Sequence, residues 1–249
     1  MNSFENLKVV INQYLTESEV AQIEKAYQLA EFAHRTQLRQ SGEPYITHPV
    51  AVAELLADMR MDPPTIMAAI LHDVVEDTTI SHDDLVATVG EEVAKLVDGV
   101  TKLTQIDYEN YAHAQAENFR KMIMAMASDI RVILIKLADR LHNMRTIDAL
   151  PLAKRKRKSL ETLEIFAPIA NRLGMHAFRV ELEDLGFKAL YPMRYRILKS
   201  AVLKARGNRK AVVELISEQI RTGLKKMNIA HAKLSGREKH VYSIYKKNA

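Results

Sequence analysis

The fold of this chain is decided by the stretch Pro63-Pro64-Thr65-Ile66-Met67-Ala68-Ala69-Ile70-Leu71-His72-Asp73-Val74-Val75-Glu76-Asp77-Thr78. Two prolines come first and strong helix formers follow, so we expect a helix that begins at the second proline and runs through His72 and beyond. On that helix His72 and Glu76 are i,i+4 neighbours, and so are Asp73 and Asp77. The stretch therefore carries two ionisable stripes on one apolar element, which is either a solvated acidic helix end or part of a metal site.

The composition is typical of a compact helical protein. Of the 249 residues, 47% are hydrophobic and 27% are charged, with only 8 glycines and 7 prolines, which excludes a disordered chain. A chain of this length can bury a substantial core. The absence of cysteine excludes disulfides and thiolate-bound zinc. The first residues have no signal-peptide pattern and no apolar run could cross a membrane, so we expect a cytoplasmic protein without membrane contact.

The net charge of +5 suits an anionic ligand, but the charge is spread along the chain. The one dense basic run is Lys154–Lys158, and no aromatic residue interleaves with it. We therefore interpret this run as a solvated helix face and expect no direct nucleic-acid binding.

A loop followed by a helix is predicted ahead of the decisive stretch. The Ser-Gly and Glu-Pro content of Arg39–Thr47 indicates the loop. Pro49 then favours a helix over Val50–Met59, with His48 at or near its N-cap. Farther along, the polar segment Thr101–Ala114 lacks sustained periodicity and is predicted to be a loop.

A second buried helix is predicted at Ile130–Thr146, because its first half is almost continuously apolar. Asp139, Asn143 and Thr146 form a narrow polar stripe on this helix, and Lys136 lies one turn before them. Polar groups on such a helix need partners, so the stripe marks a candidate site.

The burial of Asp139 requires a compensating positive charge, since an unpaired buried carboxylate is costly. One alternative is a salt bridge with Arg140 or Arg145. The other is a divalent cation, which would lower the pKa of a bound water and make hydroxide available near neutral pH. Two imidazoles and two carboxylates accept manganese, iron or zinc, so the ligand types alone do not choose the metal. The residues that would hold the cation jointly are His48, His72, Asp73 and Asp139.

Three longer strings resemble a known family. They are SGEPYITHP at 41–49, LHDVVEDT at 71–78 and KLADRLHNMRT at 136–146. Their order of His, His-Asp and Asp resembles the HD superfamily of metal-dependent phosphohydrolases. The strings themselves resemble the hydrolase domain of the RelA/SpoT family of stringent-response enzymes, with the closest wording in its bifunctional SpoT branch. The resemblance covers essentially the whole chain.

The resemblance implies an all-α fold, an HD-domain helical bundle, and a (p)ppGpp 3′-pyrophosphohydrolase that turns guanosine tetra- and pentaphosphate into GDP or GTP and pyrophosphate. It implies a Mn²⁺ cofactor held by His48, His72, Asp73 and Asp139, and it assigns Glu76 and Asp77 as the catalytic acidic pair. Many family members have lysine where this chain has Gln40, which leaves the contribution of position 40 open. The substrate-binding residues that we expect in the nucleotide pocket are Arg39, Gln40, Ser41, Tyr45, Lys136, Asn143 and Thr146.

The same resemblance divides the chain in two. Residues 1–195 are expected to form the HD-type hydrolase domain with connecting helices. Residues 196–249 are expected to form linker helices and the truncated start of an α/β synthetase domain, with a first strand at Ile229–Leu234. Amphipathic helices are predicted at Tyr195–Ala205 and Lys210–Met227. We expect no synthetase activity, because the catalytic acids of that domain are missing from the sequence.

Two alternatives to an active alarmone hydrolase stay open. The first is a catalytically inactive regulatory HD module, against which the presence of all six metal-binding and acidic residues argues. The second is an HD phosphohydrolase of another nucleotide, against which the Arg39–His48 loop argues. The resemblance also leaves room for regulatory protein partners.

Overall fold

The computed structural model describes residues 3–104, 129–206, 209–227, 229 and 240–248. Within these ranges the chain is helical, and its one β-type pairing is an isolated antiparallel bridge between Leu38 and Pro44. The predicted all-α class is therefore confirmed for the described part of the chain. The elements are α1 (Ser3–Ile11), α2 (Glu17–Ala33), α3 (Thr47–Asp58), α4 (Pro63–Leu71), α5 (Val74–Asp77), α6 (His82–Val89), α7 (Glu91–Thr104), α9 (Ile130–Arg145), the 3₁₀ turn η1 (Ile147–Ala149), α10 (Leu152–Glu161), the π-helix η2 (Thr162–Phe166), α11 (Ala167–Arg172), α12 (His176–Leu190), α13 (Pro192–Arg206), α14 (Arg209–Lys226) and α15 (Val241–Asn248).

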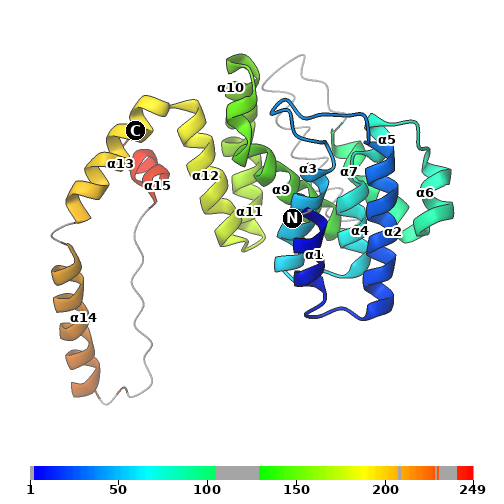
Figure 1. Cartoon of the computed structure of the whole chain (residues 1–249). Coiled ribbons are helices and arrows are strands. Elements are labelled where there is room, and N and C mark those ends of the chain that lie inside the picture. The colour runs from blue at the N-terminus through cyan, green and yellow to red at the C-terminus, as the bar shows by residue number, and fades with distance from the viewer. Residues whose placement is uncertain (1–2, 105–128, 207–208, 228, 230–239, 249) are drawn as a thin grey trace.

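Helix α4 lies at the centre of the N-terminal bundle (Figure 1). Its residues from Thr65 to Leu71 are all buried, and it packs against α2, α3, α7 and α9. The run Pro63–Leu71 contains no charged residue, and a helix that is apolar on every side is stable when other helices surround it. The decisive stretch of sequence thus becomes the centre of the core.

The helix that begins at Pro63 ends at Leu71, so the expectation of a continuous helix through His72 was wrong. His72 and Asp73 form a turn before α5. The His72 ring lies with Nδ1 2.8 Å from the Ala69 carbonyl, which in a continuous helix would accept from the Asp73 amide. The side chain therefore occupies the carbonyl that the next backbone amide of a continuous helix would use.

The loop before α3 folds back on itself and holds the start of that helix. The Arg39 amide donates to the Glu43 carbonyl at 2.8 Å, which ties the two arms of the loop together. Helix α3 begins at Thr47, ahead of the predicted start at Val50. His48 is consequently buried inside the first turn of the helix, on rigid backbone.

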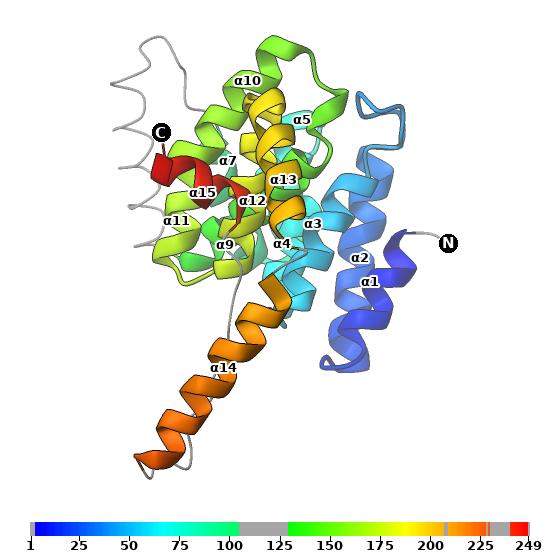
Figure 2. The same cartoon turned by 90° about the vertical axis from the view of Figure 1, so that its left-hand side faces the viewer.

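A second group of helices follows α9 (Figure 2). Helix α9 contacts α12 and η2, and α12 also contacts α10, η2 and α11. Helix α13 comes next, and α14 extends away from the bundle in both views (Figures 1 and 2). The helices predicted at Tyr195–Ala205 and Lys210–Met227 correspond to α13 and α14 and are confirmed.

Two predictions fall largely outside the described residues. Helix α7 continues through Thr104, so the loop predicted at Thr101–Ala114 was wrong for its first four residues, and 105–114 are not described. The strand predicted at Ile229–Leu234 lies outside the described residues except for Ile229. The division into a hydrolase domain and a synthetase fragment therefore stays a prediction.

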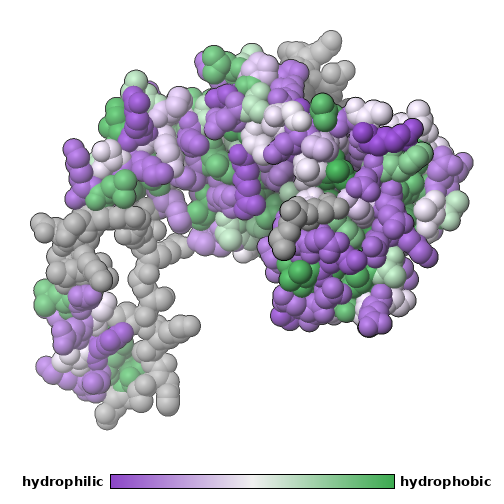
Figure 3. Space-filling view, in the orientation of Figure 1, coloured by the Kyte–Doolittle hydropathy of each residue, from purple (hydrophilic) through white to green (hydrophobic). Residues whose placement is uncertain are grey.

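The surface seen in Figure 3 is mainly hydrophilic over the bundle, with hydrophobic residues scattered among the hydrophilic ones. Scattered apolar residues are usual on a protein surface and define no patch. None of the described helices combines the length and the hydropathy that a membrane span requires.

Candidate metal centre

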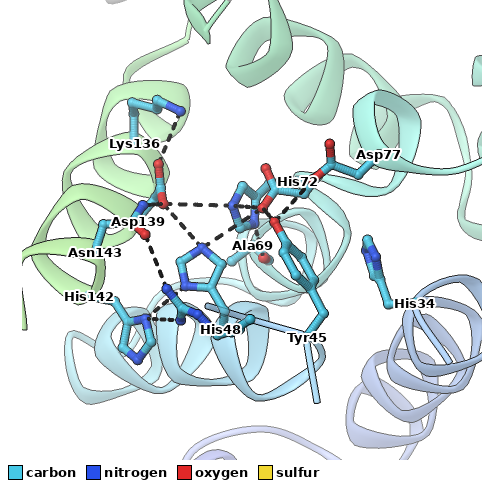
Figure 4. A network of polar contacts seen from close by, with 12 residues as sticks. His34, Tyr45, His48, Ala69, His72, Asp77, Lys136, Asp139, His142 and Asn143 are labelled. Atoms are coloured by element: carbon cyan, nitrogen blue, oxygen red, sulfur yellow. Dashed lines mark hydrogen bonds and ion pairs between the residues drawn. The ribbon is translucent and has the colours of Figure 1, made fainter. Parts of the chain in front are cut away.

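Three helices bring four ligating side chains to one point (Figure 4). His48 on α3, His72 just after α4 and Asp139 on α9 are buried, and their ligand atoms all lie within 4.8 Å of one another. Oδ1 of Asp139 is 3.2 Å from Nε2 of His48 and 4.0 Å from Nε2 of His72. Oδ2 of Asp73 completes the group, 3.1 Å from Nε2 of His72 and 3.8 Å from Nε2 of His48. The four predicted ligands therefore meet.

The charge of Asp139 is not compensated by either arginine that the sequence offered. Its Oδ2 lies 3.0 Å from Nζ of Lys136. Arg140 and Arg145 instead pair with glutamates of α10 and α12, at 3.0 and 2.6 Å, so a salt bridge from either to Asp139 was a wrong alternative. Burial would raise the pKa of the Asp139 carboxyl, but Lys136 and the two histidines hold it well below its ordinary value.

The histidine ring of the turn presents a nitrogen suited to a cation. A carbonyl oxygen only accepts, so Nδ1 of His72 donates to Ala69, and Nε2 faces the ligand cluster. This Nε2 is buried and lies 3.1 Å from Oδ2 of Asp73. Burial would lower the pKa of His72, but the carboxylates of Asp73 and Asp139 raise it to about 9. The two carboxylates thus stabilise a positive charge at this point, here the proton of His72. Together with two imidazole nitrogens they form a donor set that fits a divalent metal.

A tyrosine joins the metal-side carboxylate to the acidic pair. The hydroxyl of Tyr45 lies 2.5 Å from Oδ2 of Asp73 and 3.1 Å from Oδ2 of Asp77. Burial and the two carboxylates raise the pKa of Tyr45 far above its ordinary value, so the hydroxyl keeps its proton and donates it. Glu76 lies at the rim of the same group, and partial burial raises the pKa of its carboxyl. Tyr45, predicted to contact substrate, thus has its hydroxyl engaged by carboxylates.

The polar stripe of α9 is tied to the loop by Arg39. Its Nη2 donates to Oδ1 of Asn143 at 3.3 Å and to Oγ1 of Thr146 at 3.2 Å. Nδ2 of Asn143 in turn donates to Oδ1 of Asp139 at 2.5 Å. The loop arginine and the metal-side aspartate therefore belong to one hydrogen-bonded network.

His142 belongs to this network and was missed by the sequence interpretation. Its Nδ1 lies 2.7 Å from Nδ1 of His48 and 3.1 Å from Nη1 of Arg39. Burial, followed by the nearby His48 and Arg39, lowers the pKa of His142 to about 3, so its ring is neutral. A signal was available in the sequence, because His142 stands three residues after Asp139 and shares its side of the helix.

Most of these groups, though not His72 or His142, line one cavity of about 470 Å³. Asp73, Asp139 and His48 lie on its wall beside the acidic pair Glu76 and Asp77. The structure also brings the predicted substrate-binding residues together along this cavity: Arg39, Gln40, Ser41, Tyr45, Lys136, Asn143 and Thr146.

Another part of the cavity lining comes from α10 and η2 and was not predicted. Arg157 and Lys158 line the cavity, so the interpretation of the run Lys154–Lys158 as a solvated face was incomplete. Burial, then Arg140, lowers the pKa of Lys158. Phe166 also reaches the cavity and packs under the Arg140 guanidinium, 4.1 Å from the ring centre. The sequence of α10 alone carries no signal for this wall, because packing of one helix on another decides it.

A helical bundle that joins His, His-Asp and Asp from three core segments around one point belongs to the class of metal-binding helical domains. The HD-domain family model matches residues 26–176, which is more than half of the sequence, so the chain belongs to the HD-domain family. Membership of this family implies a divalent metal at the cluster of His48, His72 and Asp139.

Two curated relatives match nearly all of the chain. This chain is 54% identical to the bifunctional (p)ppGpp synthase/hydrolase SpoT of Escherichia coli (strain K12). The match extends over 245 residues, which are 98% of this chain and 35% of the relative. Over 247 residues, 99% of this chain and 35% of the relative, it is 53% identical to the guanosine-3′,5′-bis(diphosphate) 3′-pyrophosphohydrolase of Vibrio cholerae. The chain therefore spans about a third of the length of these relatives.

A solved structure supports the fold independently. It is described in the words "A metazoan ortholog of SpoT hydrolyzes ppGpp and plays a role in starvation responses". It is 27% identical to this chain with a TM-score of 0.52, and the match covers 70% of this chain and 96% of that one. The matched part of this chain thus corresponds to nearly the whole of that solved chain.

Proposed function

We propose that this chain is a metal-dependent hydrolase that removes the 3′-pyrophosphate from guanosine tetra- and pentaphosphate and leaves GDP or GTP. The observation that carries the proposal is the convergence of His48, His72, Asp73 and Asp139 at a cavity that also holds two further carboxylates and several cations. The choice of substrate is supported by the names of the relatives, which describe hydrolases of the same nucleotide.

We propose His48, His72, Asp73 and Asp139 as the metal ligands and Mn²⁺ as the ion, which the resemblance favours and the donor set accepts. When bound, a divalent ion lowers the pKa of a coordinated water and offsets the charge of the attacked phosphate. Two hydrogen bonds to the ligands support this arrangement. The Ala69 carbonyl accepts from the His72 ring and fixes its orientation, and the Tyr45 hydroxyl donates to the Asp73 carboxylate.

The acidic pair is proposed to orient the attacking water and to hold its proton. Glu76 suits the acceptor role, because burial raises the pKa of its carboxyl and makes it a better base than an ordinary surface glutamate. Asp77 is oriented by Tyr45, at 3.1 Å from the hydroxyl. Neither is needed as a permanent ligand, because a metal with six protein ligands would have no position left for substrate.

The cavity can neutralise a multiply charged nucleotide from both sides. Lys136 and Arg140 stand on the α9 wall, and Arg157 and Lys158 stand on the α10 wall. Charge-assisted hydrogen bonds from such groups to phosphate oxygens are roughly twice as strong as neutral ones. We propose that Arg39, Gln40, Ser41, Asn143 and Thr146 form the part of the pocket that holds the nucleoside.

A chromatographic assay of guanosine tetraphosphate tests the proposal. The chain is expected to release GDP and pyrophosphate with Mn²⁺ present, to stop when a chelator removes the ion, and to be inactive as Asp73→Asn. No turnover with bound Mn²⁺ would support an inactive regulatory module instead. Faster turnover of another nucleotide in the same assay would support the second alternative.

The remaining expectations are part of the proposal. Residues 1–195 form the hydrolase domain, and residues 196–249 form linker helices and the start of a synthetase domain. Incubation with ATP and GDP is expected to give no alarmone, and alarmone formation would refute this. A cytoplasmic location and regulatory protein partners are proposed as well, on the composition and on the resemblance.

A further inference from the structure

Two nitrogen atoms from other residues lie within hydrogen-bond distance of one ring nitrogen of His142. Nδ1 of His48 lies 2.7 Å from Nδ1 of His142, and the two ring centres are 4.9 Å apart. Nη1 of Arg39 lies 3.1 Å from the same nitrogen. Because one of the two neighbours is a guanidinium, which only donates, the hydrogens at this point can be assigned.

The assignment follows from the chemistry of the three groups. A guanidinium only donates, so Nδ1 of His142 accepts from Arg39 and carries no hydrogen. The hydrogen between the two imidazoles must then belong to His48. If Nδ1 of His142 carried the hydrogen instead, it could donate to His48, but the Arg39 N–H at 3.1 Å would then face another N–H with no acceptor.

This hydrogen decides what His48 offers to the ligand cluster. With its hydrogen on Nδ1, the ring has a lone pair on Nε2, the nitrogen 3.2 Å from Asp139 and 3.8 Å from Asp73. In the other tautomer, Nε2 would carry a hydrogen toward the position of the cation. A ligating histidine commonly donates its second nitrogen to a carboxylate, a carbonyl or water, and here a neutral imidazole takes that place.

We propose that His142 is a positioning residue of the metal centre, which fixes the ring and tautomer of His48 and links the loop residue Arg39 to it. The inference rests on the metal site of the proposed function, but not on the identity of the substrate. Arg39 also donates to Asn143 and Thr146. A ligand that moves Arg39 would therefore change the hydrogen bond that Arg39 makes to Nδ1 of His142.

The tautomers are read from the wild-type chain, and a variant serves only to assign the signals. In the whole, metal-free chain labelled with ¹⁵N-histidine, NMR is expected to show His142 as the neutral Nε2–H form and His48 with a hydrogen on Nδ1. Assignment uses the loss of one signal set in His142→Asn. Detection of a hydrogen on Nδ1 of His142 would overturn the proposal.

Metal binding gives a second test that needs no nucleotide. In His142→Leu, which has no acceptor, the affinity for Mn²⁺ measured by EPR of the free ion is expected to fall about 10- to 100-fold. In His142→Asn, whose Oδ1 can stand near the position of Nδ1, the affinity should stay within a few-fold of wild type. His82→Leu is the matched control, since His82 is a partly exposed histidine of α6 that lies 3.8 Å from Asp98 and lines no part of the metal site.

The outcomes separate this inference from the proposed function. Unchanged Mn²⁺ affinity in His142→Leu, or an equal loss in the Asn variant, would refute the positioning role even if the chain hydrolyses the alarmone. Far-UV circular dichroism checks that each variant folds, and if His142→Leu does not fold, the NMR result on the wild-type chain decides. A chain that binds Mn²⁺ as expected but hydrolyses nothing would refute only the proposed function.

Discussion

At the scale of single residues, the site depends on a few hydrogen bonds that orient its carboxylates and imidazoles. The Tyr45 hydroxyl serves Asp73 and Asp77 at 2.5 and 3.1 Å. In Tyr45→Phe both carboxylates lose this donor, so we expect about 10- to 100-fold slower hydrolysis, as for other groups that support a metal ligand. Tyr14→Phe is the matched control: its hydroxyl bonds the Met61 carbonyl at 3.1 Å, and its loss should cost about 1 kcal/mol of stability and no activity.

Steady-state kinetics and chemical denaturation measure both effects for the two tyrosine variants. Equal turnover in Tyr45→Phe and wild type would mean that the hydroxyl does not orient the carboxylates during the reaction.

The acidic pair gives a second prediction at this scale. Glu76→Gln keeps the size of the side chain and removes its basicity. If Glu76 accepts a proton, turnover should fall by about 10²- to 10⁴-fold while the bound metal, measured by elemental analysis, is unchanged. Loss of the metal together with activity would make Glu76 a ligand, and unchanged turnover would exclude both roles.

At the scale of elements, the position of Asp139 depends on how closely α9 approaches α7. A Cβ added to Gly99 of α7 would lie 2.8 Å from Cγ2 of Val132 on α9, which is too close. Gly99→Ala gains about 1 kcal/mol of helix propensity, but overpacking typically costs about 1 to 3 kcal/mol against a stiff β-branched partner. Overpacking is expected to win and to lower the free energy of unfolding.

Urea denaturation checks this prediction, with Gly223→Ala on α14 as the matched control. Apart from the neighbouring backbone of α14 itself, no heavy atom of the described residues lies within 4 Å of the Cβ that this control would add, so the gain in propensity remains and stability should rise. If Gly99→Ala gains as much stability as Gly223→Ala, α7 and α9 can separate without cost and do not fix the site.

The elements also show where sequence reasoning succeeds and fails. Hydrophobic spacing correctly predicts the buried helices, because burial of one face is a property of the segment itself. The break after Leu71 was missed, because a ring-to-carbonyl hydrogen bond at His72 overrides the helical pattern. The cavity wall formed by Arg157 and Lys158 was missed for another reason, since only the contact of η2 with α9 and the ion pair from Glu161 of α10 to Arg140 bring these residues there.

At the scale of the whole molecule, the site exists only through the tertiary fold. His48, His72 and Asp139 come from segments far apart in sequence, so no local pattern places their ligand atoms within 4.8 Å of one another. Their assignment as one group came from family resemblance and from the cost of burying Asp139 alone. The second role of the fold, to supply the acceptor His142, could not come from the resemblance and needed the geometry.

The whole chain is therefore expected to respond to its metal in a pH-dependent way. The folded pKa of His72, raised from 6.5 to about 9, means that the metal-free protein keeps this proton at neutral pH and loses it as the pH rises through 9. A metal ion must displace the proton, so Mn²⁺ affinity should increase with pH up to about 9 and then level off. Calorimetry at pH 7 should show a binding enthalpy that changes with the ionisation enthalpy of the buffer.

The same ion should stabilise the fold, because the ligands come together only in the native state. At a free Mn²⁺ concentration of 100 times Kd, the free energy of unfolding is expected to rise by about 2.7 kcal/mol. In Asp139→Asn the rise should be largely lost, because the variant removes the carboxylate that faces both histidines at 3.2 and 4.0 Å. A thermal denaturation series with and without Mn²⁺ measures the effect. Stabilisation that persists in Asp139→Asn, or a binding enthalpy independent of the buffer, would place the ion at another site.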